Sequence, residues 1–381
     1  MLERNEYLTR LNIAIQRSPV TALLGPRQCG KTTLSRQLAT QQQATFFDLE
    51  SLPDQRRLQN PELALSGLSG LVILDEIQIM PELFQVLRVL VDRPENQAKF
   101  LILGSASPTL IKSTSESLAG RVEFVELSGF DLFEVGVGNK NILWLRGGFP
   151  RAYLADSLDD SLAWREGFIR TFLERDIPQL GINIPALAMR RFWTMLAHYH
   201  GQTWNASELA RSMGLSDKTV RSYLDILTGT FMVRQLQPWF ENLSKRQVKS
   251  PKVYFRDSGL LHSLLGITDE TSLLGHPKSG ASWEGFAIEQ VLQAVRPAQA
   301  YFWSTYSGPE LDLMFFQDGK RYGVEVKFNE APNVTDSMRT AVKDLSLEHL
   351  WIVYPGKDEY PVEKNITTLP LTTVEGIKAS L

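Results

Sequence analysis

Continuous apolar runs alternate with helix-like segments through the first third of the chain. Apolar residues fill positions 20–24, 71–74 and 100–103 almost without interruption, unlike the alternation of a half-exposed strand. Such runs are typical of strands that are buried on both faces of a parallel sheet. With further strands at 44–49 and 122–127 and helical segments between them, the pattern predicts an α/β fold with a mostly parallel sheet.

The middle of the chain changes to a helical period. Apolar residues recur at helical spacing over 162–180, and further helical segments follow. Gly214 separates two short helices, the second predicted over 217–227, and this arrangement is the helix-turn-helix pattern. Two alternating segments complete the pattern of a winged helix and are predicted as strands at 231–236 and 252–255.

The last third returns to a mixed α/β pattern. Gly and Pro residues make 268–282 a predicted linker, and a helix is predicted over 283–295. Strands at 310–316 and 322–327 flank Asp318-Gly319, which is a strong signal for a two-residue hairpin turn. This part of the chain is predicted to form a small α/β domain.

These changes of pattern divide the chain into three parts. Gly147-Gly148-Phe149-Pro150 ends the first pattern, and the predicted linker ends the second. We therefore expect a nucleotide-binding-type sheet domain over 1–150, a helical and winged-helix region over 151–267, and a small α/β domain over 268–381. A length of 381 residues agrees with two or three domains.

Composition and charge narrow the class of protein further. Hydrophobic residues make up 43% and charged residues 22%, as in an ordinary globular chain, and the formal net charge of -3 predicts no general attraction to nucleic acid. The single cysteine, Cys29, excludes an internal disulfide and suits a reducing compartment. No apolar run approaches the roughly 20 residues that a membrane helix needs, so we expect a cytoplasmic protein without a membrane partner.

The segment after the first apolar run carries the clearest chemistry. It fits G-x-x-x-x-G-K-[ST], in which backbone N–H groups surround phosphate oxygens at the start of a helix. The lysine places a positive charge on the β- and γ-phosphates, and the threonine hydroxyl ligates Mg²⁺. ATP and Mg²⁺ are the expected cofactors, and the candidate nucleotide-binding residues are Gly25, Pro26, Arg27, Gln28, Cys29, Gly30, Lys31, Thr32 and Thr33.

Acidic and polar residues follow later strands of the same predicted sheet. Asp75 and Glu76 end the run at 71–74, at the strand end where open α/β sheets bind ligands. We interpret Asp75 as a Mg²⁺ residue and Glu76 as the base that polarises water; helix-capping charges are the alternative. Ser105 is a candidate contact of the γ-phosphate. Arg121 is a second such candidate, in its own subunit or in a neighbouring one, unless it is an ordinary solvated arginine.

The predicted winged helix carries candidate DNA contacts. In this interpretation the helix that starts after Ser216 enters the major groove, and the wing lies on phosphates. A winged helix that serves packing or protein contacts is an equal alternative. The candidate DNA-contact residues are Lys218, Arg221, Lys245, Arg246, Lys249 and Lys252.

The C-terminal hairpin presents a second constellation. Asp312 lies on its first strand, and Glu325 and Lys327 share one face of its second strand, because side chains alternate along a strand. With Glu284 on the preceding helix, the set resembles the PD-(D/E)XK nuclease superfamily. The resemblance implies Mg²⁺ held by the carboxylates and a lysine that positions water. A simple Glu325/Lys327 ion pair is the alternative.

The order of these motifs resembles a large prokaryotic family of AAA-type, archaeal-ATPase-like proteins. Its members carry a C-terminal domain of unknown function with a winged helix and a nuclease-like fold. Further matching segments are Leu118-Ala119-Gly120-Arg121, Gly147-Gly148-Phe149-Pro150 and the run from Lys249 to Leu260. The resemblance implies a P-loop ATPase and leaves the substrate open.

Three functions from different classes are consistent with these features. The first is Mg²⁺-dependent ATP hydrolysis that controls the C-terminal half, acting on DNA. The second is a nucleotide-gated scaffold that binds protein partners or further copies of itself through an inactive nuclease-like domain. The third is an active Mg²⁺-dependent nuclease.

Overall fold

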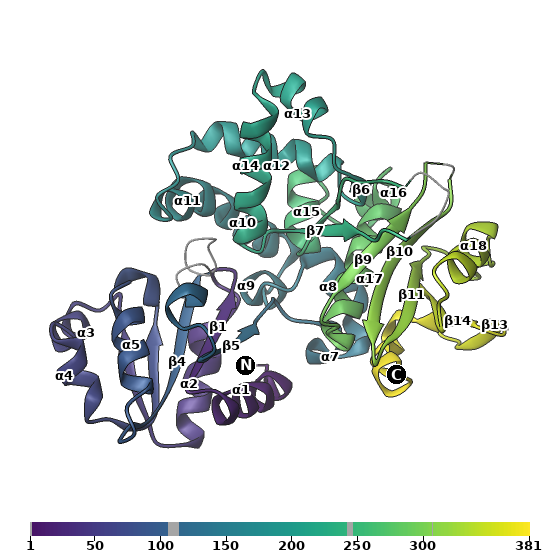
Figure 1. Ribbon diagram of the computed structural model, residues 1–381. Helices are drawn as coiled ribbons and strands as arrows, with labels where there is room; N and C mark the ends of the chain where they lie inside the picture. Colours follow the sequence, from purple (N-terminus) through teal and green to yellow (C-terminus); the bar gives the residue numbers. More distant parts are fainter. Residues whose placement is uncertain (1, 106–113, 242–246, 307) are drawn as a thin grey trace. The chain divides into compact units, whose positions relative to one another are not determined.

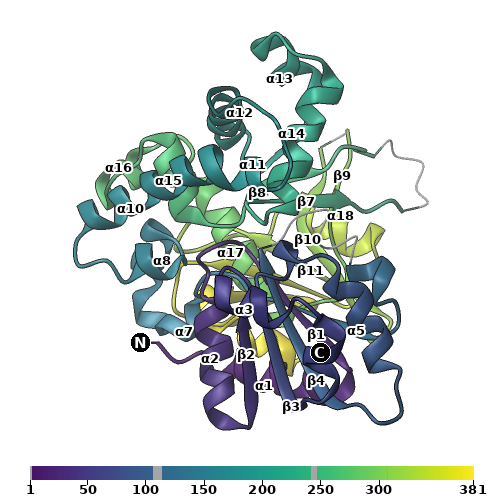
Figure 2. The same cartoon turned by 90° about the vertical axis from the view of Figure 1, so that its left-hand side faces the viewer.

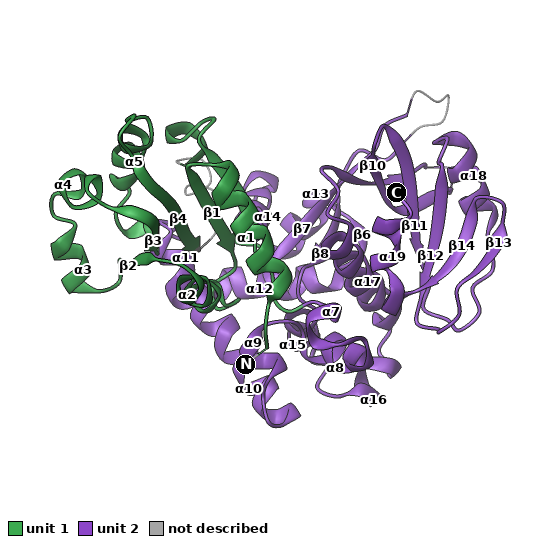
Figure 3. Cartoon of the chain, turned by 90° about the horizontal axis from the view of Figure 1, so that it is seen from below, with its two compact units in different colours: residues 1–130, 229–231 green, residues 131–228, 232–381 purple. Residues whose placement is uncertain are grey.

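The computed structural model describes residues 2–105, 114–241, 247–306 and 308–381. The chain forms two compact units (Figure 3). Unit 1 contains residues 1–130 together with 229–231, and unit 2 contains residues 131–228 and 232–381. The finer division of the chain at residues 150 and 267 stays a prediction.

Unit 1 is built on a fully parallel sheet of five strands, in the order β2-β3-β4-β1-β5 (Figure 1). The α/β class and the parallel sheet are thus confirmed. The predicted strands are also found, with ends that differ by at most a few residues. Their bounds are β1 (Val20–Gly25), β2 (Ala44–Asp48), β3 (Ser69–Asp75), β4 (Gln97–Ser105) and β5 (Val122–Glu126).

Helices cover both faces of this sheet. One face packs against α1 (Asn5–Arg17) and α2 (Lys31–Gln41). The other face packs against α4 (Pro61–Ser66), α5 (Leu83–Val91) and Leu58, which follows α3 (Leu52–Arg57).

Strand β3 shows why the apolar runs are continuous. Leu71 and Ile73 belong to the core beneath α1 and α2, whereas Val72 and Leu74 belong to the core on the opposite face. Because successive side chains point to opposite faces of a sheet, a strand between two helical layers must be apolar at every position. The polar Asp75 comes where the strand ends.

The first part of unit 2 is helical. Aromatic rings of Phe168, Phe172 and Trp193 contact one another in its core, with ring centroids 6.1 and 5.2 Å apart. Its elements are α7 (Leu132–Val135), α8 (Lys140–Arg146), α9 (Pro150–Tyr153), α10 (Leu158–Thr171), α11 (Ile177–Gln179) and α12 (Ala186–His198).

The predicted pair of short helices follows. The Asn205 side chain accepts a hydrogen bond from the N–H of Glu208 and caps α13 (Ala206–Met213). Gly214 ends this helix with φ of 70°, a conformation that glycine adopts without strain. Helix α14 (Asp217–Gly229) lies beside α12 and α13 (Figures 1 and 2).

Three strands on either side of these helices in sequence belong to the same sheet as the C-terminal strands. Strand β8 (Lys252–Phe255) pairs in antiparallel fashion with both β6 (Gln202–Thr203) and β7 (Val233–Pro238). Strand β7 also pairs in parallel with β9 (Ala300–Ser304). The helical region and the C-terminal domain therefore share one nine-stranded sheet, in the order β13-β14-β12-β11-β10-β9-β7-β8-β6.

The predicted hairpin is confirmed. Strand β10 (Glu310–Gln317) pairs with β11 (Lys320–Val326), and Asp318 and Gly319 both have positive φ in the turn. Strand β12 (His349–Tyr354) extends the sheet in parallel to β11. The remaining elements are α18 (Asp336–Asp344), β13 (Tyr360–Glu363), β14 (Ile366–Pro370) and α19 (Glu375–Ala379).

The predicted linker at 268–282 is wrong. Helix α16 (Glu270–Gly275) and the first turn of α17 (Ser279–Val295) occupy this segment, after α15 (Ser258–Leu265). Gly275 is the last residue of α16, Pro277 stands between α16 and α17, and Gly280 lies in the first turn of α17. Short helices with turn residues between them therefore give a sequence pattern that resembles a loop.

Candidate functional site

The phosphate-type loop joins β1 to α2 in unit 1. Gly30 precedes α2 with φ of 102° and has no side chain with which to cap the helix. The first N–H groups of α2 therefore remain for a ligand, and the helix dipole favours an anion there. A Cβ atom on Gly25 would lie 2.1 Å from the carbonyl oxygen of Leu127, so this position requires glycine.

Lys31 turns its side chain back into the loop. Its ammonium group donates hydrogen bonds to the carbonyl oxygens of Gly25, at 3.0 Å, and Pro26, at 2.8 Å. The residue is buried, with 6% of its surface exposed. The positive charge thus lies inside the loop, beside the backbone of Gly25 and Pro26.

Thr32 and Asp75 come together although 43 residues separate them in sequence. The Thr32 hydroxyl donates a hydrogen bond of 2.7 Å to Oδ2 of Asp75 at the end of β3. Burial raises the pKa of the Asp75 carboxyl group, and the hydrogen bond from Thr32 opposes this shift. A hydroxyl beside a carboxylate at a phosphate loop is a donor set that suits Mg²⁺. The residues present therefore fit this ion.

Glu76 adopts a left-handed backbone conformation, with φ of 57°. This conformation is uncommon for a residue other than glycine, and such strained positions cluster at functional sites. The N–H of Glu76 donates to Oδ1 of Asp75 at 3.0 Å, and the Gln78 amide donates to Oε2 of Glu76. Sequence reasoning missed Gln78, for which the only available signal was its position two residues after Glu76.

Arg4 and Cys29 contact backbone carbonyl oxygens in and near the phosphate loop. The Arg4 guanidinium donates to the carbonyl oxygens of Cys29, Ser128 and Gly129 at 3.1–3.2 Å. The Cys29 side chain is buried and lies 3.6 Å from the carbonyl oxygen of Leu127. Arg4 was also missed, because an isolated arginine near the start of a chain forms no recognisable motif. Of the remaining loop candidates, Arg27 is half-buried, and Gln28 and Thr33 are exposed.

The two candidate γ-phosphate contacts lie at opposite ends of the parallel strands. Ser105 ends β4, and its backbone pairs with Gly25 beside the loop. Arg121 precedes β5 and lies next to the start of β1, where the Val20 N–H donates to its carbonyl oxygen. Its guanidinium pairs with Asp92 at 2.7 and 2.8 Å.

This position bears on the candidate role of Arg121. Five residue steps along β1, from Val20 to Gly25, separate Arg121 from the loop, at about 3.3 Å for each step. Contact between Arg121 and a phosphate in its own loop is therefore excluded. Its role in a neighbouring subunit stays a prediction.

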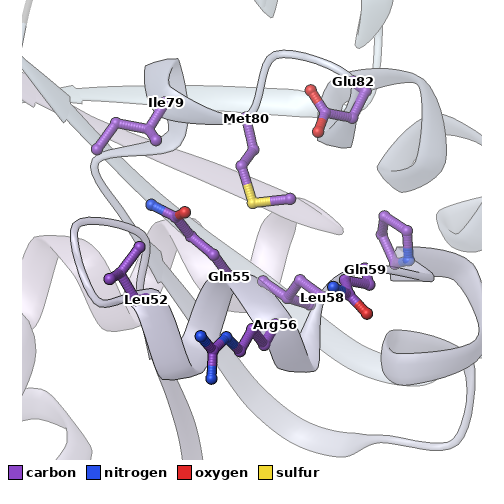
Figure 4. Close-up of a pocket in the computed structure, with 9 residues that line it drawn as sticks. Leu52, Gln55, Arg56, Leu58, Gln59, Ile79, Met80 and Glu82 are labelled. Carbon is purple, nitrogen blue, oxygen red and sulfur yellow. The ribbon is translucent and has the colours of Figure 1, made fainter.

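A cavity of about 440 Å³ lies elsewhere on unit 1 (Figure 4). Leu52, Gln55 and Arg56 border it from α3, and Ile79, Met80 and Glu82 border it from the segment after β3. No residue of the phosphate loop lines it. The cavity is therefore separate from the phosphate site.

The candidate DNA-contact residues have different environments. Lys218 and Arg221 are exposed on α14, away from its buried residues, and Lys249 is exposed before β8. Lys245 and Arg246 lie outside the described residues. Lys252 as a DNA contact is wrong, because its side chain is buried among carboxylates.

The predicted C-terminal constellation gathers around Lys252. Its ammonium group lies 3.3 Å from Oδ1 of Asp312, 3.7 Å from Glu284 and 4.0 Å from Glu310. The Tyr254 hydroxyl donates a hydrogen bond of 2.6 Å to Glu284. Burial and the nearby Asp312 raise the pKa of Glu284 to about 7.

Glu325 and Lys327 complete this cluster. The Lys327 ammonium group donates to Oε1 of Glu325 at 2.7 Å, and the Val326 N–H donates to Oδ2 of Asp312 at 3.0 Å. Burial, with Asp312 nearby, raises the pKa of Glu325 to about 8. Within the described ranges, no three His, Cys, Asp or Glu side chains are arranged to hold a metal ion.

Family models match three successive parts of the chain. An AAA domain matches residues 17–136, a domain of unknown function (DUF8612) matches residues 141–271, and another (DUF4143) matches residues 279–374. Two mycobacterial proteins match almost the whole chain. The uncharacterized proteins Rv2008c of Mycobacterium tuberculosis and Mb2031c of Mycobacterium bovis are each 54% identical over 370 residues, covering 97% of this chain and 84% of the relative.

The chain belongs to the AAA-domain family of these two proteins. Solved structures show more distant likeness. The Walker-type ATPase PABY2304 of Pyrococcus abyssi has a TM-score of 0.49 at 14% identity, covering 70% of this chain and 96% of that chain. The DNA clamp loader delta protein of Bacillus subtilis has a TM-score of 0.26 at 12% identity, covering 58% and 87%. Unit 1 is a P-loop NTPase domain on the basis of its loop geometry and the matching AAA model.

No helix in the described part of the chain is long and apolar enough to cross a membrane. The two helical segments of greatest length, α10 and α17, both carry charged residues and pack within unit 2.

Proposed function

We propose that unit 1 binds ATP with Mg²⁺ and hydrolyses it. The observation that carries this proposal is the contact between Thr32 and Asp75, 2.7 Å long, beside the open N-terminus of α2. A loop that only turned the chain would not need a buried carboxylate, a hydroxyl and a buried lysine at one point. Supporting this proposal, Glu76 follows Asp75 at the same strand end.

Each residue then has a separate task. Lys31 exchanges its two loop carbonyl oxygens for phosphate oxygens, and the α2 N–H groups bind the same phosphates. Thr32 and Asp75 would hold Mg²⁺, which would neutralise charge on the phosphates when bound. Glu76 accepts a hydrogen bond from the attacking water and draws its proton away, while Gln78 holds the carboxylate in position.

Removal of the metal tests the proposal directly. We expect phosphate release from ATP in the presence of Mg²⁺ and none above background after addition of excess EDTA, with recovery on renewed addition of Mg²⁺. The measurement is colorimetric detection of phosphate. Equal phosphate release with and without EDTA would contradict the assignment of Thr32 and Asp75.

We further propose that nucleotide state controls a DNA-binding surface on unit 2, with α13 and α14 as part of a winged helix. Support comes from the antiparallel strands β6, β7 and β8 that accompany these helices, and from the exposed side chains of Lys218 and Arg221 on α14. The second candidate, a scaffold for protein partners, is favoured by the occupation of the nuclease-like carboxylates by Lys252.

A change of Lys218 and Arg221 to alanine separates these two functions. Each phosphate contact contributes about 0.9 to the slope of log affinity against log salt. We therefore expect the double variant to lose almost 2 units of this slope in fluorescence anisotropy with duplex DNA. Lys343→Ala, at an exposed position on α18, is the control. A wild-type protein without DNA affinity, or a double variant with an unchanged slope, would favour the scaffold.

A further inference from the structure

Strand β8 reaches helix α17 through alternate side chains. Lys252 lies 3.7 Å from Glu284, the Tyr254 hydroxyl donates to Glu284, and Arg256 lies 3.6 Å from Glu289. Positions 252, 254 and 256 share one face of an extended chain, because side chains alternate along it. The basic residues of this segment thus face carboxylates of the same unit.

Lys252 is surrounded by carboxylates from two elements. Glu284 comes from α17, whereas Glu310 and Asp312 come from β10. All three lie within 4.0 Å of the ammonium nitrogen, and 6% of the Lys252 surface is exposed. A buried ammonium group is costly unless opposite charges compensate it. These carboxylates provide that compensation.

The carboxylates of this cluster offer more hydrogen-bond acceptor oxygens than the ammonium groups of its two lysines occupy. Four carboxylates, those of Glu284, Glu310, Asp312 and Glu325, face the ammonium groups of Lys252 and Lys327. Glu325 is 4% exposed, and its Oε2 atom has no hydrogen-bond partner among the residues that the structure describes. Carboxylate oxygens of this kind are the donors that Mg²⁺ and Mn²⁺ prefer.

We propose that Lys252 is the resident cation of this carboxylate cluster and excludes divalent metal ions from it. Removal of the Lys252 side chain opens a divalent-cation site at Glu284 and Asp312, next to Glu325. With Lys252 in place the nuclease-like domain carries no metal there.

The test compares Mn²⁺ binding by full-length variants in electron paramagnetic resonance. Lys252→Met should gain one Mn²⁺ site per chain that binds at least tenfold more tightly than any site at these carboxylates in the wild type. Asp312→Asn added to Lys252→Met should abolish the gain. Lys249→Met, at an exposed position three residues away, is the matched control and should behave as the wild type does. Mn²⁺ should also raise the thermal midpoint of Lys252→Met through this site.

The wild type provides a test that does not depend on the folding of Lys252 variants. Wild type and Asp312→Asn should bind Mn²⁺ equally, because Lys252 keeps the metal out of the cluster in the wild type. A wild-type site that Asp312→Asn removes would overturn the proposal. A folded Lys252→Met variant without a new Mn²⁺ site would overturn it as well. Metal at the phosphate loop does not affect either comparison, because Asp312 is not part of that site.

Discussion

A change of Glu76 to glutamine is expected to reduce the turnover number for ATP at least a hundredfold. The amide keeps the size and hydrogen-bonding capacity of the side chain but loses the negative charge that polarises water. General base catalysis typically contributes about 10²–10⁴ to the rate. Affinity for ATP should change little, because the proposed function assigns the phosphate contacts to Lys31, Thr32 and the α2 N–H groups.

The geometry around Glu76 explains why the effect should fall on turnover. Its backbone is fixed in a left-handed conformation by the bond from its N–H to Asp75, and Gln78 holds its carboxylate. A glutamine at this position meets the same neighbours, so the fold of unit 1 should be retained. The variant therefore separates catalysis from binding.

Turnover is measured by phosphate release under saturating ATP, and affinity is measured by isothermal titration calorimetry. Glu82→Gln is a suitable control, because Glu82 is an exposed acid of the same unit that lies outside the loop. Its turnover number should equal that of the wild type. An unchanged turnover number for Glu76→Gln would leave Glu76 with a purely structural role.

The phosphate site was predictable because its parts are encoded locally. The loop is one contiguous motif, and Asp75-Glu76 directly follow a run whose burial on both faces is evident from composition. Parallel strands bring their carboxyl ends to one edge, so the contact between Thr32 and Asp75 follows from topology. Arg4 and Gln78 were not predictable, since both act through backbone or side-chain partners that only the folded chain places.

Arg121 and Lys252 show the limits of such predictions. Arg121 belongs to a segment that is recognisable in the sequence. The direction of β5 nevertheless places this arginine at the end of the strands opposite the phosphate loop. The sequence predicts Lys252 as a DNA contact on an exposed wing, and lysine is indeed rarely buried in proteins. Its burial depends on three acids more than 30 residues away in sequence, and no local pattern reveals such a pairing.

The segment from Lys249 to Leu260, whose chemistry was not evident from sequence, also has a structural explanation. Asp257 accepts hydrogen bonds from the N–H groups of Gly148, at 2.7 Å, and Leu260, at 2.8 Å. A Cβ atom on Gly259 would lie 2.0 Å from the carbonyl oxygen of Arg146. The segment therefore packs against the Gly147-Gly148 turn within unit 2.

A change of Lys31 to alanine should weaken ATP binding by about tenfold to a hundredfold or more. Hydrogen bonds to charged groups contribute about 1.5–3 kcal/mol each, and Lys31 is a buried charged donor within the loop. Calorimetric titration with ATP and Mg²⁺ measures the change. Circular dichroism and the thermal midpoint establish whether the loop variant is folded, because Lys31 also binds the carbonyl oxygens of Gly25 and Pro26.

Lys99 offers a matched control for this experiment. Its ammonium group also contacts two backbone carbonyl oxygens, those of Gln16 at 3.5 Å and Ser18 at 3.3 Å, but at the opposite edge of the same sheet. Lys99→Ala therefore removes similar contacts without touching the phosphate site. ATP affinity should be unchanged in Lys99→Ala and weakened to the predicted extent in Lys31→Ala. Equal affinities in the two variants would mean that the Gly25–Thr32 loop does not bind the nucleotide, whatever other site does.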